Sequence, residues 1–174
     1  MAESQPTPDP LVEASRSVAW LIAANKPFYP LYVWAFVGSG TAASLWTAAS
    51  LPLWLALGWF GPRRPLLLKT GVPLLGALDT ALSTKLFGAP GLTELFFAPC
   101  ALLAILPFRA AEAWTSRALV GVLYVVFVGL HGRYGAPLHI WSETELASLA
   151  NINALAVASL MAFLGWRFSG LSKS

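Results

Sequence analysis

The chain has 174 residues, only 11% of them charged, and its mean hydropathy is +0.66. A soluble domain of this size could not cover its exterior with so few polar side chains, so the composition predicts an integral membrane protein. At roughly 20 residues for each span, the length allows five or six crossings and excludes a soluble catalytic domain. The net charge of +3 comes from basic residues between apolar segments, which favours membrane orientation over nucleic-acid binding.

The N-terminal third is the hardest part to divide into spans. No charge occurs from Pro27 to Pro62, and 36 residues would make about 54 Å of continuous helix, too long for one crossing and short for two. Aromatic clusters follow Lys26 and precede Arg63, as at the two membrane interfaces. We therefore expect one crossing over about 36–60, with an interfacial helix before it.

The complete prediction is an all-α polytopic membrane helix bundle with five transmembrane helices and an N-terminal interfacial helix. Six transmembrane helices are the alternative. The expected divisions are an N-terminal tail and interfacial segment, the bundle, and a C-terminal tail, at 1–34, 35–168 and 169–174. Four further spans are expected at 66–87, 91–108, 117–132 and 146–167. The acidic start of the chain has no basic region before an apolar core, so we expect no removable signal peptide.

Basic residues orient these spans. With the C-terminus in the cytoplasm of a bacterium, only Lys85 and Arg133 fall in short loops on the outer side of the inner membrane. Arg16 and Lys26 would lie outside with five spans and inside with six, so charge favours six while span length favours five. The residues expected inside are Arg63, Arg64, Lys69, Arg109, Arg117, Arg167 and Lys173.

Local signals indicate how the helices start and pack. Ser142 precedes the last apolar run with Glu145 three residues later, which predicts a capping box at the start of that helix. Small residues recur every fourth position, which favours close helix packing within the bundle, in a homo-oligomer or against a partner. These residues are Gly40, Ser44, Ala48, Ala150, Ala154, Ala158 and Ala162.

Polar side chains concentrate in the outer half of the predicted bundle. Asp79 lies about two thirds of the way across its span, where a charge costs about 2.5–3.5 kcal/mol unless it is protonated, paired or near water. We predict an outward-facing cup for a small polar or amphiphilic ligand. The alternative is an Asp79 bonded to a neighbouring helix, with the other residues meeting lipid head groups. The predicted lining is Asp79, Thr80, Ser83, Glu94, His131, Asn151 and Asn153.

Motifs of catalysis and metal binding do not occur. The chain contains no HExxH, CxxC, GxSxG or Gly-rich phosphate loop, and no pair of intramembrane carboxylates at helical spacing. His131 and His139 are separated by Gly and Pro, which favours helix-end or loop positions over haem or pigment ligands. We therefore expect no enzyme activity, no cofactor and no metal.

Two stretches resemble the multi-span sensory modules that precede the catalytic domain in some bacterial class III adenylate cyclases and quorum-sensing histidine kinases. The first runs from Lys85-Leu-Phe-Gly through Thr93-Glu-Leu-Phe-Phe-Ala-Pro-Cys100 to Pro107-Phe-Arg109, and the second from Tyr134-Gly-Ala-Pro-Leu-His-Ile-Trp-Ser through Asn151-Ile-Asn-Ala to Arg167. The resemblance implies a six-helix ligand-sensing or anchoring domain whose cytoplasmic output is joined to the last helix. Seven residues follow Arg167, so we expect output through a separate partner, or a truncated module.

The expected function is therefore that of a small non-enzymatic membrane protein. It would act as a sensor-like module or accessory subunit that binds a partner complex through its helix faces. The alternatives are a small-solute transporter that uses Asp79 as its titrating group, and an intramembrane enzyme that acts on a lipid-like substrate.

Overall fold

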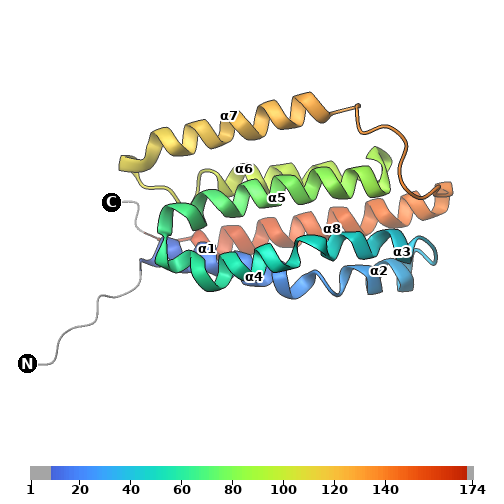
Figure 1. Ribbon diagram of the computed structural model, residues 1–174, viewed down its shortest axis with the longest axis horizontal. Helices are drawn as coiled ribbons and strands as arrows, with labels where there is room; N and C mark the ends of the chain where they lie inside the picture. Colours follow the sequence, from blue (N-terminus) through green and yellow to red (C-terminus); the bar gives the residue numbers. More distant parts are fainter. Residues whose placement is uncertain (1–8, 172–174) are drawn as a thin grey trace, which may run out of the picture.

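The computed structural model describes residues 9–171, which form helices and no strand (Figure 1). The predicted tail residues 1–8 and 172–174 lie outside the described residues. The helices run side by side along one long axis. α1 begins and α8 ends at the same end of the bundle, which we call the basic end because Arg63, Arg109 and Arg167 lie there. The opposite, loop end carries the turns 37–40, 88–92 and 131–142.

Four helical segments within residues 9–171 are long and apolar enough to cross a membrane. Three of them contain α5 (Pro65–Phe87), α7 (Ala113–Leu130) and α8 (Glu143–Phe168), close to the spans expected at 66–87, 117–132 and 146–167. The fourth segment, Thr41–Arg63, joins α3 (Thr41–Ser44), η1 (Leu45–Ser50), α4 (Leu51–Phe60) and η2 (Gly61–Arg63). The all-helical, membrane-compatible character predicted from composition is confirmed.

The segment between α5 and α7 is broken into short helices. It contains η3 (Ala89–Gly91), η4 (Thr93–Phe96) and α6 (Phe97–Leu103), and η5 (Ala110–Glu112) leads into α7. The apolar helical part spans Thr93–Leu103, which is shorter than the span expected at 91–108.

α1 (Pro10–Asn25) and α2 (Tyr29–Phe36) follow one another along the bundle, beside α4 and α3 (Figure 1). Pro27 separates them, since proline has no N–H to donate to a helical hydrogen bond. The sequence predicts an interfacial segment here, whereas the structure packs α1 against α4 and α5. Leu11, Ala14 and Val18 are fully buried in that contact.

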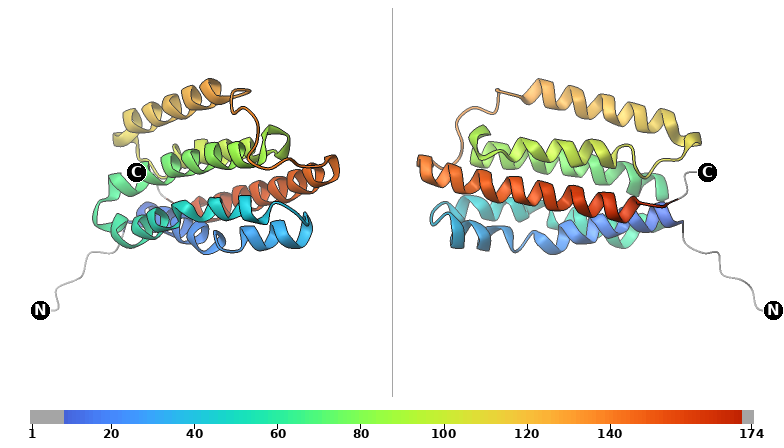
Figure 2. Two further views of the ribbon diagram at one scale, coloured as in Figure 1. Left: turned by 45° about the vertical axis from the view of Figure 1, so that its right-hand side comes forward. Right: turned by 180° about the vertical axis from the view of Figure 1, so that it is seen from behind.

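Three buried clusters hold the described helices together. The first joins α1, α4, α5 and α8 around Trp54, Leu68 and Leu164, all fully buried. The second joins α5, α6 and α7 around Ala104 and Leu119. The third joins α2, α5 and α8 around Phe87 and Leu149. α7 lies at one edge of the bundle (Figure 2), and only two of its side chains are buried, as expected for a helix that faces lipid.

The capping box predicted at the start of α8 is confirmed. The Ser142 hydroxyl accepts a hydrogen bond from the Glu145 amide at 3.3 Å, and the Glu145 carboxylate accepts one from the Ser142 amide at 2.7 Å. This reciprocal pair satisfies two of the amide donors that a helix N-terminus leaves open, and it fixes where α8 begins after the long loop.

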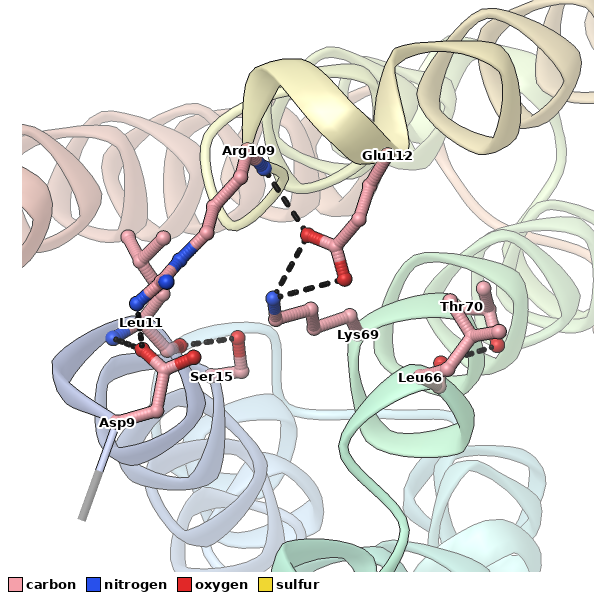
Figure 3. A network of polar contacts seen from close by, with 8 residues as sticks. All are labelled: Asp9, Leu11, Ser15, Leu66, Lys69, Thr70, Arg109 and Glu112. Carbon is pink, nitrogen blue, oxygen red and sulfur yellow. Dashed lines mark hydrogen bonds and ion pairs between the residues drawn. The ribbon is translucent and has the colours of Figure 1, made fainter. Parts of the chain in front are cut away.

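A polar network ties three elements together at the basic end (Figure 3). Lys69 of α5 is buried, and its Nζ atom lies 2.9 Å from Oε2 of Glu112 in η5. The same carboxylate accepts from the Arg109 amide at 3.0 Å, while the Arg109 guanidinium lies 3.3 Å from Asp9, which caps α1 through the Leu11 amide. The network therefore connects the starts of α1, α5 and α7.

Candidate functional site

A lysine and an aspartate form a buried ion pair in the middle of the bundle. Lys26 lies at the break between α1 and α2, Asp79 lies within α5, and Nζ and Oδ2 are 2.7 Å apart. Their side chains are only 10% and 13% exposed. A charged carboxylate in the interior of a membrane bundle requires a partner or water, and Asp79 has that partner in Lys26.

Two further contacts fix the geometry of this pair. Trp54 of α4 donates its indole N–H to Oδ2 of Asp79 at 2.6 Å. The Lys26 ammonium donates to the Thr47 carbonyl at 2.7 Å. In an α-helix the Leu51 amide would donate to the Thr47 carbonyl. In the 3-10 turn that amide donates to the Ala48 carbonyl instead, so the Thr47 carbonyl is available to Lys26. The break in the Thr41–Arg63 segment thus supplies a ligand for Lys26.

Hydrogen-bonding capacity remains at the ion pair. The Oδ1 atom of Asp79 is buried and has no hydrogen-bond partner among the described residues. Lys26 uses one of its three N–H groups on Thr47 and one on Asp79, which leaves one N–H available. A buried carboxylate oxygen without a donor costs roughly 1–3 kcal/mol or more, so the site is suited to a molecule that supplies one.

The ion pair lines a cavity of about 610 Å³ enclosed by α1, α2, α5, α6 and α8, which we call the central cavity. Its polar lining lies at the level of the pair and toward the loop end. Its apolar lining lies mostly toward the basic end. The main polar residues are Lys26, Tyr29, Asp79, Thr80, Ser83 and Asn153, and the main apolar residues are Leu21, Val72, Leu103, Leu160 and Phe163.

The central cavity opens sideways rather than only at an end of the bundle. Tyr32 and Phe36 of α2 and Leu155 of α8 contribute to its lining and are themselves exposed, Phe36 by 67% and Leu155 by 70%. In a bilayer these side chains would face acyl chains, because both helices lie on the outside of the bundle (Figure 2). A molecule dissolved in the membrane could enter between α2 and α8.

Asn153 holds the loop-end side of the cavity together. Its side chain is fully buried, donates to the Gly91 carbonyl at 2.7 Å and accepts from the Tyr29 hydroxyl at 2.9 Å. These two bonds join α8 to η3 and to α2. Both polar ends of the amide are satisfied, so Asn153 shapes the cavity wall and leaves the Asp79 carboxylate as the acceptor that lacks a donor.

The structure divides the predicted cup into separate groups. Asp79, Thr80, Ser83 and Asn153 line the central cavity. Glu94 and His131 lie together elsewhere, with Oε2 and Nδ1 3.0 Å apart at the loop end of α7. Asn151 is exposed on α8 and does not line the cavity.

Sequence reasoning missed three residues of the site. The aromatic pattern places Lys26 and Tyr29 at the membrane interface, and no feature of the sequence distinguishes Trp54 from the other aromatic residues of its apolar run. The signal for Lys26 was present, since a lysine enclosed between two apolar helices and followed by Pro marks a helix break with a free cation. Its partner, 53 positions later in the chain, could not be identified from local pattern.

Other polar contacts at the loop end hold the loop between α7 and α8 in place. Lys85 of α5 donates to the carbonyls of Tyr134 at 3.0 Å and Ala136 at 2.7 Å. Burial and the nearby Glu94 carboxylate raise the pKa of the Tyr134 phenol, so it is neutral at physiological pH. These contacts fasten the loop to α5.

No group of three or more His, Cys, Asp and Glu residues within residues 9–171 is placed to hold a metal ion. Cys100 is a free, buried thiol in the cavity lining. Comparison of the chain with protein-family models, with curated proteins and with solved structures finds no match.

Proposed function

We propose that this protein is a multi-pass membrane module of the sensor type, which binds a small amphiphilic molecule in the central cavity and signals to a partner protein through its helix faces. The observation that carries this proposal is the buried Lys26–Asp79 pair in the wall of a largely apolar cavity open to the bilayer. A ligand site of this kind combines apolar walls with a few convergent polar groups.

The proposed topology has six crossings. α1 and α2 together form the first, the broken segment Thr41–Arg63 the second, and the short helices from Ala89 to Leu103 the fourth. An even number of crossings agrees with the start of α1 and the end of α8 at one end of the bundle (Figure 1). The basic residues gather at that end, so the positive-inside rule favours a cytoplasmic basic end in a bacterial inner membrane.

Binding is favoured over catalysis by the composition of the lining. Asp79 is the only carboxylate that lines the central cavity among the described residues. Its two partners, Lys26 and Trp54, both donate hydrogen bonds to the carboxylate, and the lining holds no second carboxylate that would form an acid–base pair with it. The site is therefore better suited to hold a ligand than to transform one.

Signalling requires that the cavity be connected to a surface available to a partner. α8 lines the cavity with Ile152, Asn153 and Leu155 and continues to the basic end, where Arg167 donates to the Ser17 hydroxyl of α1 at 3.2 Å. A ligand between α2 and α8 would displace α8, which runs as one continuous helix of 26 residues to the basic end, so the displacement would reach Arg167. We propose α8 as the output element.

Photo-crosslinking in lipid nanodiscs tests the binding site. A decanol carrying a diazirine near the end of its tail is expected to label cavity residues such as Leu103 and Leu160. Ala156→Phe fills the cavity and should abolish this labelling, whereas Ala158→Phe, on the exposed side of the same helix, should preserve it. Equal labelling of the cavity by both variants, or labelling confined to exposed positions of α7, would contradict the proposal.

A second candidate, transport of a small solute with Asp79 as the titrating group, is favoured by the carboxylate oxygen that has no donor. A titratable group within a bundle often lies on a proton pathway. Proteoliposomes with an imposed pH gradient distinguish the two functions. Transport predicts solute-dependent proton uptake that Asp79→Asn abolishes, while the sensor proposal predicts ligand binding without net flux.

A further inference from the structure

We infer that the molecule held in the central cavity has an uncharged head group that donates an O–H or N–H hydrogen to Asp79 and accepts one from Lys26. This inference rests on the proposed function, because it specifies which ligand that cavity selects. It concerns the chemistry of the head group, which the ion pair determines.

Charge balance excludes ionic head groups. Lys26 and Asp79 lie 2.7 Å apart, and they are the only charged side chains among the described residues that line the cavity. The pair is neutral as a whole. A ligand with a fixed positive or negative charge would leave one charge uncompensated in a largely apolar cavity, which is far costlier than burying a neutral polar group.

The unused hydrogen-bonding capacity selects the head group further. An ionised carboxylate only accepts, so Oδ1 of Asp79 requires a donor from the ligand. The remaining N–H of Lys26 requires an acceptor. A hydroxyl group meets both needs at once, since it has one donor and two acceptor lone pairs, whereas an ether oxygen only accepts.

The polarity of the two sides of the cavity predicts where the ligand's tail and its head group lie. Beyond the pair, the wall toward the basic end is mainly apolar and includes Val72, Leu103 and Phe163. A hydrocarbon tail would lie there, with the head group at the level of Asp79. Ser83 lies one helical turn beyond Asp79, on the loop-end side, and can contact a second polar group of the head.

A series of photoreactive probes with one tail and four head groups tests this inference. The heads are a primary alcohol, its methyl ether, a sulfonate and a trimethylammonium, and the readout is labelling of cavity residues in nanodiscs, quantified by peptide mass spectrometry. For the unmodified protein we expect the alcohol to label at least about tenfold more than either charged probe, and several-fold more than the ether. Equal or stronger labelling by a charged probe would overturn the inference.

Charge variants should redirect the selectivity. Asp79→Asn leaves Lys26 uncompensated and should raise labelling by the sulfonate relative to the alcohol, while Lys26→Met should do the same for the trimethylammonium probe. Glu112→Gln and Lys69→Met remove the same kinds of charge from the ion pair at the basic end, outside the cavity, and should keep the original order of the probes. An unchanged order in both cavity variants would overturn the inference.

The two proposals fail in different ways. If no probe labels the cavity of the unmodified protein, the proposed binding function is wrong. If charged probes label it as well as the alcohol does, the cavity binds amphiphiles but the inferred head-group selectivity is wrong. The series on the unmodified protein decides this even where a charge variant does not fold.

Discussion

The Nζ atom of Lys26 lies 2.7 Å from Oδ2 of Asp79, between a break in the N-terminal helices and the middle of α5. The same ammonium binds the Thr47 carbonyl, and the same carboxylate oxygen accepts from Trp54. Four elements therefore meet at one ion pair: the α1–α2 break, η1, α4 and α5. The pair serves both the packing of the broken segments and the chemistry of the cavity.

Removal of one charge of this pair should destabilise the fold strongly. Asp79→Asn leaves the Lys26 ammonium buried without a counter-charge, and we expect a loss of about 3–5 kcal/mol in the free energy of unfolding. Unfolding by SDS in mixed micelles, monitored by circular dichroism, measures this free energy. The double variant with Lys26→Met should lose less than the sum of the single losses, because no charge is left unpaired. Strict additivity would show that the two side chains act independently.

Trp54→Phe tests the indole hydrogen bond separately from the charges. Trp54 is fully buried and donates to Asp79 at 2.6 Å, so the variant should lose about 1.5–3 kcal/mol from the bond to a charged acceptor. Trp59→Phe is the matched control, since Trp59 is 63% exposed on the same helix. We expect that control to stay within about 0.5 kcal/mol of the parent protein. Similar losses for both variants would contradict a specific role for the indole N–H.

Asn151 and Asn153 show what a local sequence pattern can predict. Like Asp79, both are polar residues in an apolar run, so the sequence indicates that the bundle contains polar side chains at these positions. Residues i and i+2 lie on nearly opposite helix faces, and only the packing of α8 decides that Asn153 is buried and Asn151 exposed. Glu94 and His131 are likewise expected in the cup because their positions along the spans indicate depth in the membrane but no direction around the helices.

The long helices were predictable because their signals are local. Apolar length marked α5, α7 and α8, and the Ser142 capping box marked the start of α8. Apolar length also marked the crossing expected over about 36–60, which corresponds to Thr41–Arg63, although its η1 turn has no local signal. The packing of α1 and α2 into the bundle was not predictable, since Pro27 interrupts them and their stability comes from contacts with other helices rather than from helix propensity. Lys26 was for the same reason assigned to an interface instead of the bundle interior.

Asn153→Ala should destabilise the protein far more than Asn151→Ala. The first variant leaves the Gly91 carbonyl and the Tyr29 hydroxyl without their partner, which we expect to cost about 2–4 kcal/mol. The second changes an exposed side chain and should stay within about 0.5 kcal/mol. The SDS denaturation described above compares them directly. Equal losses would mean that the buried amide network does not hold α2, η3 and α8 together.

Six crossings place the start of α1 and the end of α8 on the same side of the membrane, whereas five place them on opposite sides. In a Cys100→Ala background, we expect Thr144→Cys to react with a membrane-impermeant maleimide applied to spheroplasts, and Ser169→Cys to react only after permeabilisation. Both topologies predict those two results, so they serve as controls. Glu13→Cys distinguishes the two topologies. With six crossings it should react only after permeabilisation, like Ser169→Cys, because α1 begins at the basic end and the positive-inside rule favours a cytoplasmic basic end. Labelling of Glu13→Cys in intact spheroplasts would instead require that α1 and α2 not cross, and Lys26 would then no longer lie at the depth of Asp79.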